Sequence, residues 1–233
     1  MNHEYGAAAA RLCGSLLIWM VVLFTVAAAV YGISGNGDLL AREMLCCAPP
    51  GTTGLPEEEY AGVGRMTAGY LTGKEEVFQY TFSDAEGRVF TCFQSYEADH
   101  MADCRELIAL AGMMRWITGA AAMLLVCAGL MLRRRRDFAN GMFTGLCTAA
   151  ALAAGIAVWA FVDFDGLFVT FHRLAFTNEG WLLDPRTDLL IRLMPTSFFV
   201  ALGTKIMIGM ILSALILFAA AIAIQKNKGN AAQ

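Results

Sequence analysis

Two histidines are the residues of this sequence best suited to move a proton at neutral pH. His172 lies in a polar segment, FHRLAFTNEGWLLDP, between two long apolar runs, and His100 lies between Glu97 and Asp103, three residues to either side. A spacing of three places side chains on about one third of a helix circumference. An imidazole, with an ordinary pKa of about 6.5, can accept or give up a proton near neutral pH. We therefore expect the rest of the chain to bring His172 and His100 together. The third histidine, His3, lies in the amino-terminal tail and is assigned no role.

The apolar runs around these segments predict a membrane protein. Hydrophobic residues make up 58% of the 233 residues and charged residues only 16%, against roughly 45–50% and 25% in soluble domains. A bilayer core needs roughly 20 helical residues to cross. Four runs reach about this length, 12–33, 116–132, 141–162 and 198–224. We expect four transmembrane helices at these positions.

Basic residues predict the orientation of the spans. The second run is followed by a short basic segment, 133–140, that opens with four arginines. Arg11 precedes the first run, and Lys226 and Lys228 follow the fourth. Basic residues in short loops stay on the cytoplasmic side. We therefore expect both termini to be cytoplasmic.

This orientation places the two longer connections, 34–115 and 163–197, outside the cell membrane. Segment 34–115 carries 13 acidic and six basic residues, a formal charge of −7. That sign provides no electrostatic footprint for nucleic acid. Ala27 and Ala29 leave open a cleaved signal peptide as an alternative for the first run, and both connections would still lie outside.

The connections predict a small mixed cap on a mostly α-helical membrane protein. Segments 77–82 and 89–94 alternate in polarity and flank turn residues, which predicts a β-hairpin. Helices are expected over 39–47, capped by Asp38, and over 56–71. Another is expected over 185–194 with Asp184 as its cap, lying in the membrane interface. The segment 167–176 is too short to span and is also expected at the interface.

Several single residues carry weaker expectations. Tyr70 and Trp181 are candidate interface anchors, and Tyr70 is alternatively a substrate contact. Lys205, in the fourth run, either snorkels to the surface or pairs with Asp163, Asp165 or a lipid headgroup phosphate. The cysteines of the outer segments allow three disulfide pairings, and the sequence does not choose among these and reduced thiols. They are Cys46, Cys47, Cys92 and Cys104.

The two histidine segments resemble a known family. The stretches EADHMADCREL and FHRLAFTNEGWLLDPRTDLLIRLMPTSFF, with four spans around them, are similar to the lipoprotein intramolecular transacylase (Lit) family of bacterial membrane proteins. The matching positions are Glu97, His100, Asp103, Phe171, His172, Phe176, Asn178, Trp181, Asp184, Pro185, Asp188 and Pro195. The resemblance implies an enzyme of the bacterial cell membrane that acts on a diacylated lipoprotein.

The reaction that the resemblance implies moves the sn-2 acyl chain of a diacylglyceryl-cysteine to the α-amino group of the same cysteine. His172 would be the general base and later the acid. His100 would be an oxyanion donor or proton partner, oriented by Glu97 or Asp103. Arg173 and Asn178 are weaker candidates for contacts to the carbonyl. The partners are the lipoprotein, in the outer leaflet, and membrane lipid, and no cofactor or metal is required.

Two alternatives belong to other classes. Glu97, His100, Asp103 and His172 could instead hold zinc in a metal-dependent membrane hydrolase, although their spacing is unlike the familiar zinc motifs. The chain could also be a sensor or assembly factor without enzymatic activity. No P-loop, GxGxxG or GxSxG motif is present.

Overall fold

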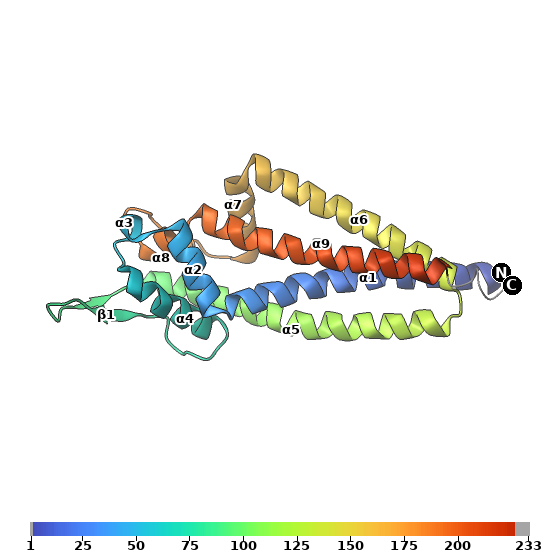
Figure 1. Ribbon diagram of the computed structural model, residues 1–233, viewed down its shortest axis with the longest axis horizontal. Helices are drawn as coiled ribbons and strands as arrows, with labels where there is room; N and C mark the ends of the chain where they lie inside the picture. Colours follow the sequence, from blue (N-terminus) through green and yellow to red (C-terminus); the bar gives the residue numbers. More distant parts are fainter. Residues whose placement is uncertain (1, 227–233) are drawn as a thin grey trace. The chain divides into compact units, whose positions relative to one another are not determined.

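The computed structural model describes residues 2–226 and is mostly helical. The side chain of His3 and the position of Lys228 lie outside what is described. Four of the described helices are long and apolar enough to cross a membrane (Figure 1). They are α1 Asn2–Ser34, α5 Ser95–Met131, α6 Arg135–Val162 and α9 Thr196–Lys226. The predicted fold class, four spans with a β-hairpin, is confirmed.

Each spanning helix is longer than its predicted apolar run. The longest, α5, has 37 residues, about 55 Å at 1.5 Å per residue. A bilayer core is about 30 Å thick, so α5 continues well beyond it. His100 lies in the second turn of this helix, far from the apolar run at 116–132.

The chain divides into two compact units. The span unit comprises Met1–Ala28, Met113–Val162 and Ile206–Gln233, and the loop unit comprises Ala29–Gly112 and Asp163–Lys205.

The span unit is held together by small and apolar residues. Gly14 lies against the backbone of Phe138, and Gly141 lies against the backbone of Arg11. A Cβ at either glycine would collide, so these glycines let α1 and α6 approach closely, as in many membrane helix pairs. The buried apolar core of the unit consists of Ala10, Leu17, Ile18, Phe138, Met142, Ala149 and Ala221.

The loop unit contains the short elements. They are α2 Gly37–Cys47, α3 Pro50–Thr53, the 3₁₀ turn η1 Glu57–Glu59, α4 Tyr60–Leu71, β1 Thr81–Ser83, β2 Val89–Thr91, α7 Phe164–Ala175 and α8 Leu189–Leu193 (Figure 1). The amino-terminal part of α5 belongs to the same unit. Helices α2 and α4 pack on each other. The core includes Met44, Tyr60, Val63, Phe78, Phe93, Leu193 and Phe198.

The predicted hairpin is present with shorter strands. Thr81 pairs with Thr91, Phe82 with Phe90 and Ser83 with Val89. At the end of the hairpin away from its turn, the side chain of Gln79 makes hydrogen bonds to the backbone that follows the other strand. Its amide donates to the Phe93 carbonyl at 2.7 Å and accepts from the Phe93 N–H at 3.1 Å.

Three local expectations were wrong. The cap of α2 is Asn36, which accepts from the Leu39 N–H at 3.0 Å, and the helix begins at Gly37 rather than Leu39. The helix expected over 185–194 is only Leu189–Leu193. The Asp188 carboxylate accepts the Asp184 N–H at 2.7 Å, and Asp184 in turn binds the Arg186 N–H, so this stretch is held in a turn.

The third concerns Lys205. It pairs with neither Asp163 nor Asp165. Its Nζ lies 2.9 Å from the Glu43 carboxylate of α2, a residue more than 100 positions away that no local spacing could have indicated.

Candidate active site

His172 has a fixed tautomer. It lies in the last turn of α7 and is 7% exposed. Its Nδ1 is 2.8 Å from the carbonyl oxygen of Phe168, one helical turn earlier. A carbonyl oxygen can only accept, so Nδ1 carries the proton. In the neutral ring Nε2 therefore holds the free lone pair and is the basic atom.

His100 lies beside His172 on a different element. The ring centroids are 6.0 Å apart, so α5 and α7, which are not consecutive helices, bring the two imidazoles together. His100 is 8% exposed. Its Nε2 lies 3.6 Å from Cys104 Sγ, and its Nδ1 is buried without a hydrogen-bond partner among the described residues.

Aromatic rings enclose the histidine pair. The His172 ring centroid lies 4.1 Å from that of Phe168, 5.0 Å from Trp181 and 5.4 Å from Phe171. Phe176 contacts both histidines. Burial among these rings lowers the pKa of His172 below its ordinary value, and the hydrogen bond to Phe168 opposes this only in part. The ring is therefore neutral, and able to act as a base, at pH 7.

Glu97 does not orient His100, contrary to one of the two predicted arrangements. The carboxylate is 1% exposed. Its oxygens accept the N–H groups of Gln94 and Leu190, each at 2.7 Å. Glu97 therefore joins the beginnings of α5 and α8. The spacing of three between Glu97 and His100 indicated a shared helix face. The N–H groups at the beginnings of two helices, which have no partner within their own helix, bind the carboxylate instead.

Asp103 and Asn178 connect α5 to the chain after α7. The Asn178 amide donates to Asp103 at 2.8 Å. The backbone carbonyl oxygen of Asn178 accepts a hydrogen bond from the Trp181 indole N–H at 3.1 Å. These contacts hold the Trp181 ring against His172. Trp181, expected as an interface anchor, is thus a wall of the histidine site.

Two candidate residues have surroundings of their own. Arg173 is exposed and makes no ion pair with any other described residue. Tyr70 is 6% exposed and packs edge-on against Phe78, with the Arg105 guanidinium 5.0 Å from its ring centre. Burial of Tyr70 in the core contradicts its expected place as an interface anchor.

Two neighbours of the histidines were missed. Cys104 follows His100 by four residues, and Phe168 precedes His172 by four. On a helix this spacing makes neighbours, so the signal was present in the sequence. Cys104 was considered as a disulfide candidate or a reduced thiol, without a role beside His100, and all seven cysteines are unpaired thiols in this structure.

The four residues considered as zinc ligands do not form a ligand set. Glu97 is engaged by backbone amides and Asp103 by Asn178. Within residues 2–226, no group of three or more His, Cys, Asp or Glu side chains is arranged to hold a metal ion. The acid–base arrangement is what the geometry supports.

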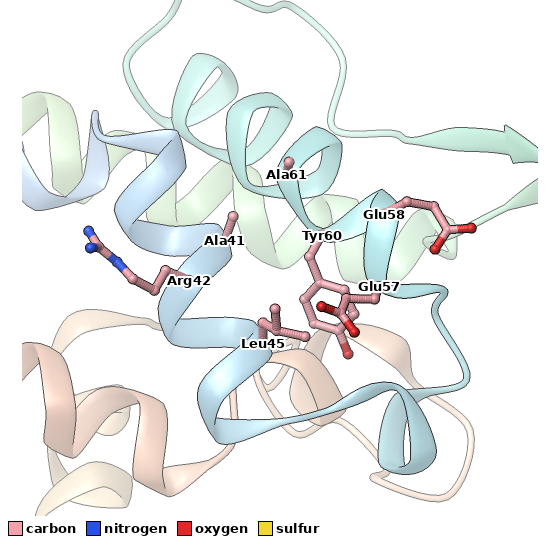
Figure 2. Close-up of a pocket in the computed structure, with 7 residues that line it drawn as sticks. All are labelled: Ala41, Arg42, Leu45, Glu57, Glu58, Tyr60 and Ala61. Atoms are coloured by element: carbon pink, nitrogen blue, oxygen red, sulfur yellow. The ribbon is translucent and has the colours of Figure 1, made fainter.

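Two cavities lie elsewhere in the molecule. One of about 540 Å³, in the loop unit, is lined by residues of α2, η1 and the beginning of α4, including Arg42, Glu57 and Tyr60 (Figure 2). The other, of about 270 Å³ in the span unit, is walled by α1, α6 and α9 and is almost wholly apolar. Neither of these two cavities is lined by a histidine. The two histidines are themselves buried, at 8% and 7% exposed.

The fold and site define a class of protein: a multi-pass membrane protein with two adjoining buried imidazoles. Residues 15–199 match the family model described as "Lipoprotein intramolecular transacylase Lit". The match covers more than half of the chain, and the chain belongs to this family. The protein is therefore a membrane transacylase of a family that acts on lipoproteins, and the interpretation as a non-enzymatic sensor is set aside.

Solved structures show the same fold. The membrane integral lipoprotein intramolecular transacylase Lit from Bacillus cereus is 17% identical, with a TM-score of 0.74 over 98% of this chain and 99% of that chain. Variants of that protein with one histidine replaced by arginine or alanine give TM-scores of 0.72 and 0.71, at 17% and 18% identity. The match to the arginine variant covers 99% of this chain and 98% of that chain. The match to the alanine variant covers 98% of this chain and 99% of that chain. No match was found among curated proteins.

Proposed function

We propose that the protein transfers the sn-2 acyl chain of a diacylglyceryl-cysteine to the α-amino group of the same cysteine, with His172 as general base and acid. The observation that carries this proposal is the fixed tautomer of His172, which leaves Nε2 free to accept a proton beside a second buried imidazole. The hydrogen bonds that engage Glu97 and Asp103 favour proton transfer between imidazoles over metal-assisted hydrolysis.

The first step forms the new carbon–nitrogen bond. The amine nitrogen attacks the sn-2 ester carbonyl carbon and loses a proton to His172 Nε2. A free α-amino group has a pKa of about 8, so a share of it is already neutral at pH 7 and can attack. The carbonyl oxygen becomes an oxyanion, which a hydrogen-bond donor must stabilise. We assign this donor to His100.

The second step breaks the ester. The oxyanion collapses, the bond to the glycerol oxygen breaks, and the Nε2–H of His172 returns its proton to that oxygen. The products are an N-acyl cysteine and a free sn-2 hydroxyl, and His172 is neutral again. The base gained and lost one proton, so the cycle needs no cofactor.

Proximity contributes much of the rate in this scheme. Amine and ester belong to one molecule, so holding them at the two rings replaces a bimolecular encounter. Both rings are over nine-tenths buried, and the substrate must therefore displace part of the aromatic enclosure. We assign this movement to the stretch with Asn178 and Trp181, which the Asn178–Asp103 hydrogen bond ties to α5.

We further propose that the site faces the outer leaflet. The arginines at 133–136 lie between the second and third spans, whereas His100 precedes the second span and His172 follows the third. Arg11 precedes the first span, and the segment that carries His100 follows that span. Basic residues near the ends of short loops are retained in the cytoplasm. The two segments that carry the histidines would then meet lipoproteins after their export.

The test uses a synthetic lipopeptide with different acyl chains at sn-1 and sn-2. Substrate and product are isomers, so the intact mass does not change and the lipopeptide must be fragmented. Purified enzyme should place the sn-2 chain on the α-nitrogen. Mixing isotope-labelled and unlabelled lipopeptides should give no crossed product. Transfer of the sn-1 chain, or a crossed product, would contradict the proposal.

A further inference from the structure

The surroundings of His100 leave one of its nitrogens without a partner. Nε2 faces the Cys104 thiol at 3.6 Å. Nδ1 is buried and unpartnered among the described residues. A buried polar group without a partner costs free energy, so Nδ1 has a hydrogen-bonding capacity that a bound substrate can use. The proposed oxyanion is a ligand of the required chemistry, because it accepts hydrogen bonds.

Whether Nδ1 can donate depends on the thiol. A neutral imidazole carries one proton, on Nδ1 or on Nε2, and the other nitrogen accepts. A thiol is a weak donor and a weak acceptor. If Cys104 donates its proton to Nε2, the ring proton must reside on Nδ1. If Cys104 accepts instead, Nδ1 bears a lone pair and cannot stabilise an oxyanion.

The role of His172 decides between these two states. Its Nε2 already supplies the lone pair that the reaction needs, while the oxyanion needs a donor. We infer that Cys104 is a positioning residue: its thiol donates to His100 Nε2 and thereby holds His100 in the tautomer that presents Nδ1–H to the oxyanion. This inference rests on the proposed function and adds a residue that the family resemblance did not include.

The contact is local and well held. Cys104 and His100 are one turn apart on α5, and Cys104 packs at the edge of the apolar core of the loop unit. The other groups around His100 are the rings of His172 and Phe176 and the carboxylate of Asp103. Asp103 accepts the Asn178 amide. Among these neighbours, Cys104 is the one within hydrogen-bond distance of Nε2.

Three substitutions separate hydrogen bonding from packing. Cys104→Ser keeps a hydroxyl that can donate, Cys104→Val fills the space without a donor, and Cys104→Ala removes both. We expect kcat to fall about tenfold in the alanine and valine variants, which is ~1.4 kcal/mol of transition-state stabilisation. The serine variant should stay within about threefold of the unchanged protein. KM should change little, since the oxyanion exists only after attack.

The matched control is Cys127→Ala, an exposed cysteine further along the same helix, which should keep full activity. Thermal unfolding in detergent would be recorded for each variant. A loss of activity in the serine variant as large as in the alanine variant would assign the effect to packing and overturn the inference. So would unchanged activity in all three.

A second measurement needs no substitution at Cys104. Nitrogen-15 NMR of labelled histidine distinguishes a protonated Nδ1 from a protonated Nε2, and His100→Gln would identify the signal. Protonation at Nδ1 is expected, and protonation at Nε2 would overturn the inference. His100→Ala, assayed in parallel, distinguishes a failure of the proposed function from a failure of the role inferred for Cys104. Full activity there would remove His100 from the proposed function itself, whereas inactivity with normal Cys104 variants would refute only the thiol's role.

Discussion

The two units hold themselves together in different ways. In the span unit most side-chain hydroxyls bond to a carbonyl of their own helix, as Thr25 does with Val21 and Ser213 with Gly209. In the loop unit several polar side chains join different elements. Glu97 reaches α8, and Tyr96 donates to Asp188 at 2.7 Å.

The difference shows where this sequence is constrained. Apolar surface facing lipid can be met by many residue types, and large residues such as Leu124 and Phe161 are exposed on the span unit, where a bilayer would cover them. A carboxylate that satisfies two backbone amides has few substitutes. We therefore expect substitutions to have large effects in the loop unit and small effects in the span unit.

The largest effect is expected at His172. His172→Ala removes the proton carrier, and kcat should fall by about 10²–10⁴-fold, the usual contribution of general acid–base catalysis. Fragmentation of the N-terminal lipopeptide of a co-expressed reporter measures the product. The protein should still accumulate in membranes. Activity within a few-fold of the unchanged protein would refute the assignment of the base.

The next effect concerns stability rather than chemistry. Glu97→Gln removes the charge that accepts two backbone amides, and should lower the free energy of unfolding by about 1.5–3 kcal/mol. Thermal unfolding in detergent measures this change, and Glu106→Gln, exposed on the same helix, is the control. The kcat of the folded enzyme should be retained. A lower kcat with unchanged stability would instead return Glu97 to the role of orienting His100.

The third effect concerns the pKa of His172. Burial lowers the pKa of His172, so the ring should take up its proton only at pH values below about 6.5, the ordinary value. The base is then neutral above this pH and is lost as the pH falls through the lowered pKa. An NMR titration of the ring, assigned with His172→Gln, measures the midpoint. A midpoint at or above 6.5 would show that the ring is not enclosed as the structure describes.

The smallest effect is expected in the span unit. Thr25 Oγ1 lies 3.3 Å from the Ser213 hydroxyl, a contact between α1 and α9. Such contacts in membranes contribute on average about 0.6 kcal/mol. Thr25→Val should therefore change stability by less than about 1 kcal/mol and activity by less than about twofold. A large loss of stability would mean that the span unit also depends on specific polar contacts.

Much of the architecture could be predicted because it follows from local patterns. Length and hydropathy identify a span without knowledge of its neighbours, and alternation with turn residues identified the hairpin. The juxtaposition of His100 and His172 was expected from their places next to spans. The resemblance, rather than spacing, suggested the chemistry.

What could not be predicted depends on partners distant in sequence. Spacing placed Glu97 on the face of His100 but could not reveal the amide of Leu190, 93 residues away. Glu43 as the partner of Lys205 was hidden for the same reason. The acceptor of the His172 hydrogen bond is local, because the carbonyl of Phe168 lies four residues earlier in α7. A prediction of α7 as a helix would have been enough to recognise it.

The most direct test of the two-histidine site is a double-mutant cycle. His100→Ala, His172→Ala and the double variant would be compared by the initial rate of N-acylation of one lipopeptide, with folding checked by thermal unfolding. Residues that act as a unit give strongly non-additive losses. We predict that the double variant is no more than a few-fold slower than His172→Ala. Losses that multiply independently would show that the imidazoles do not act in one step, and would contradict the mechanism.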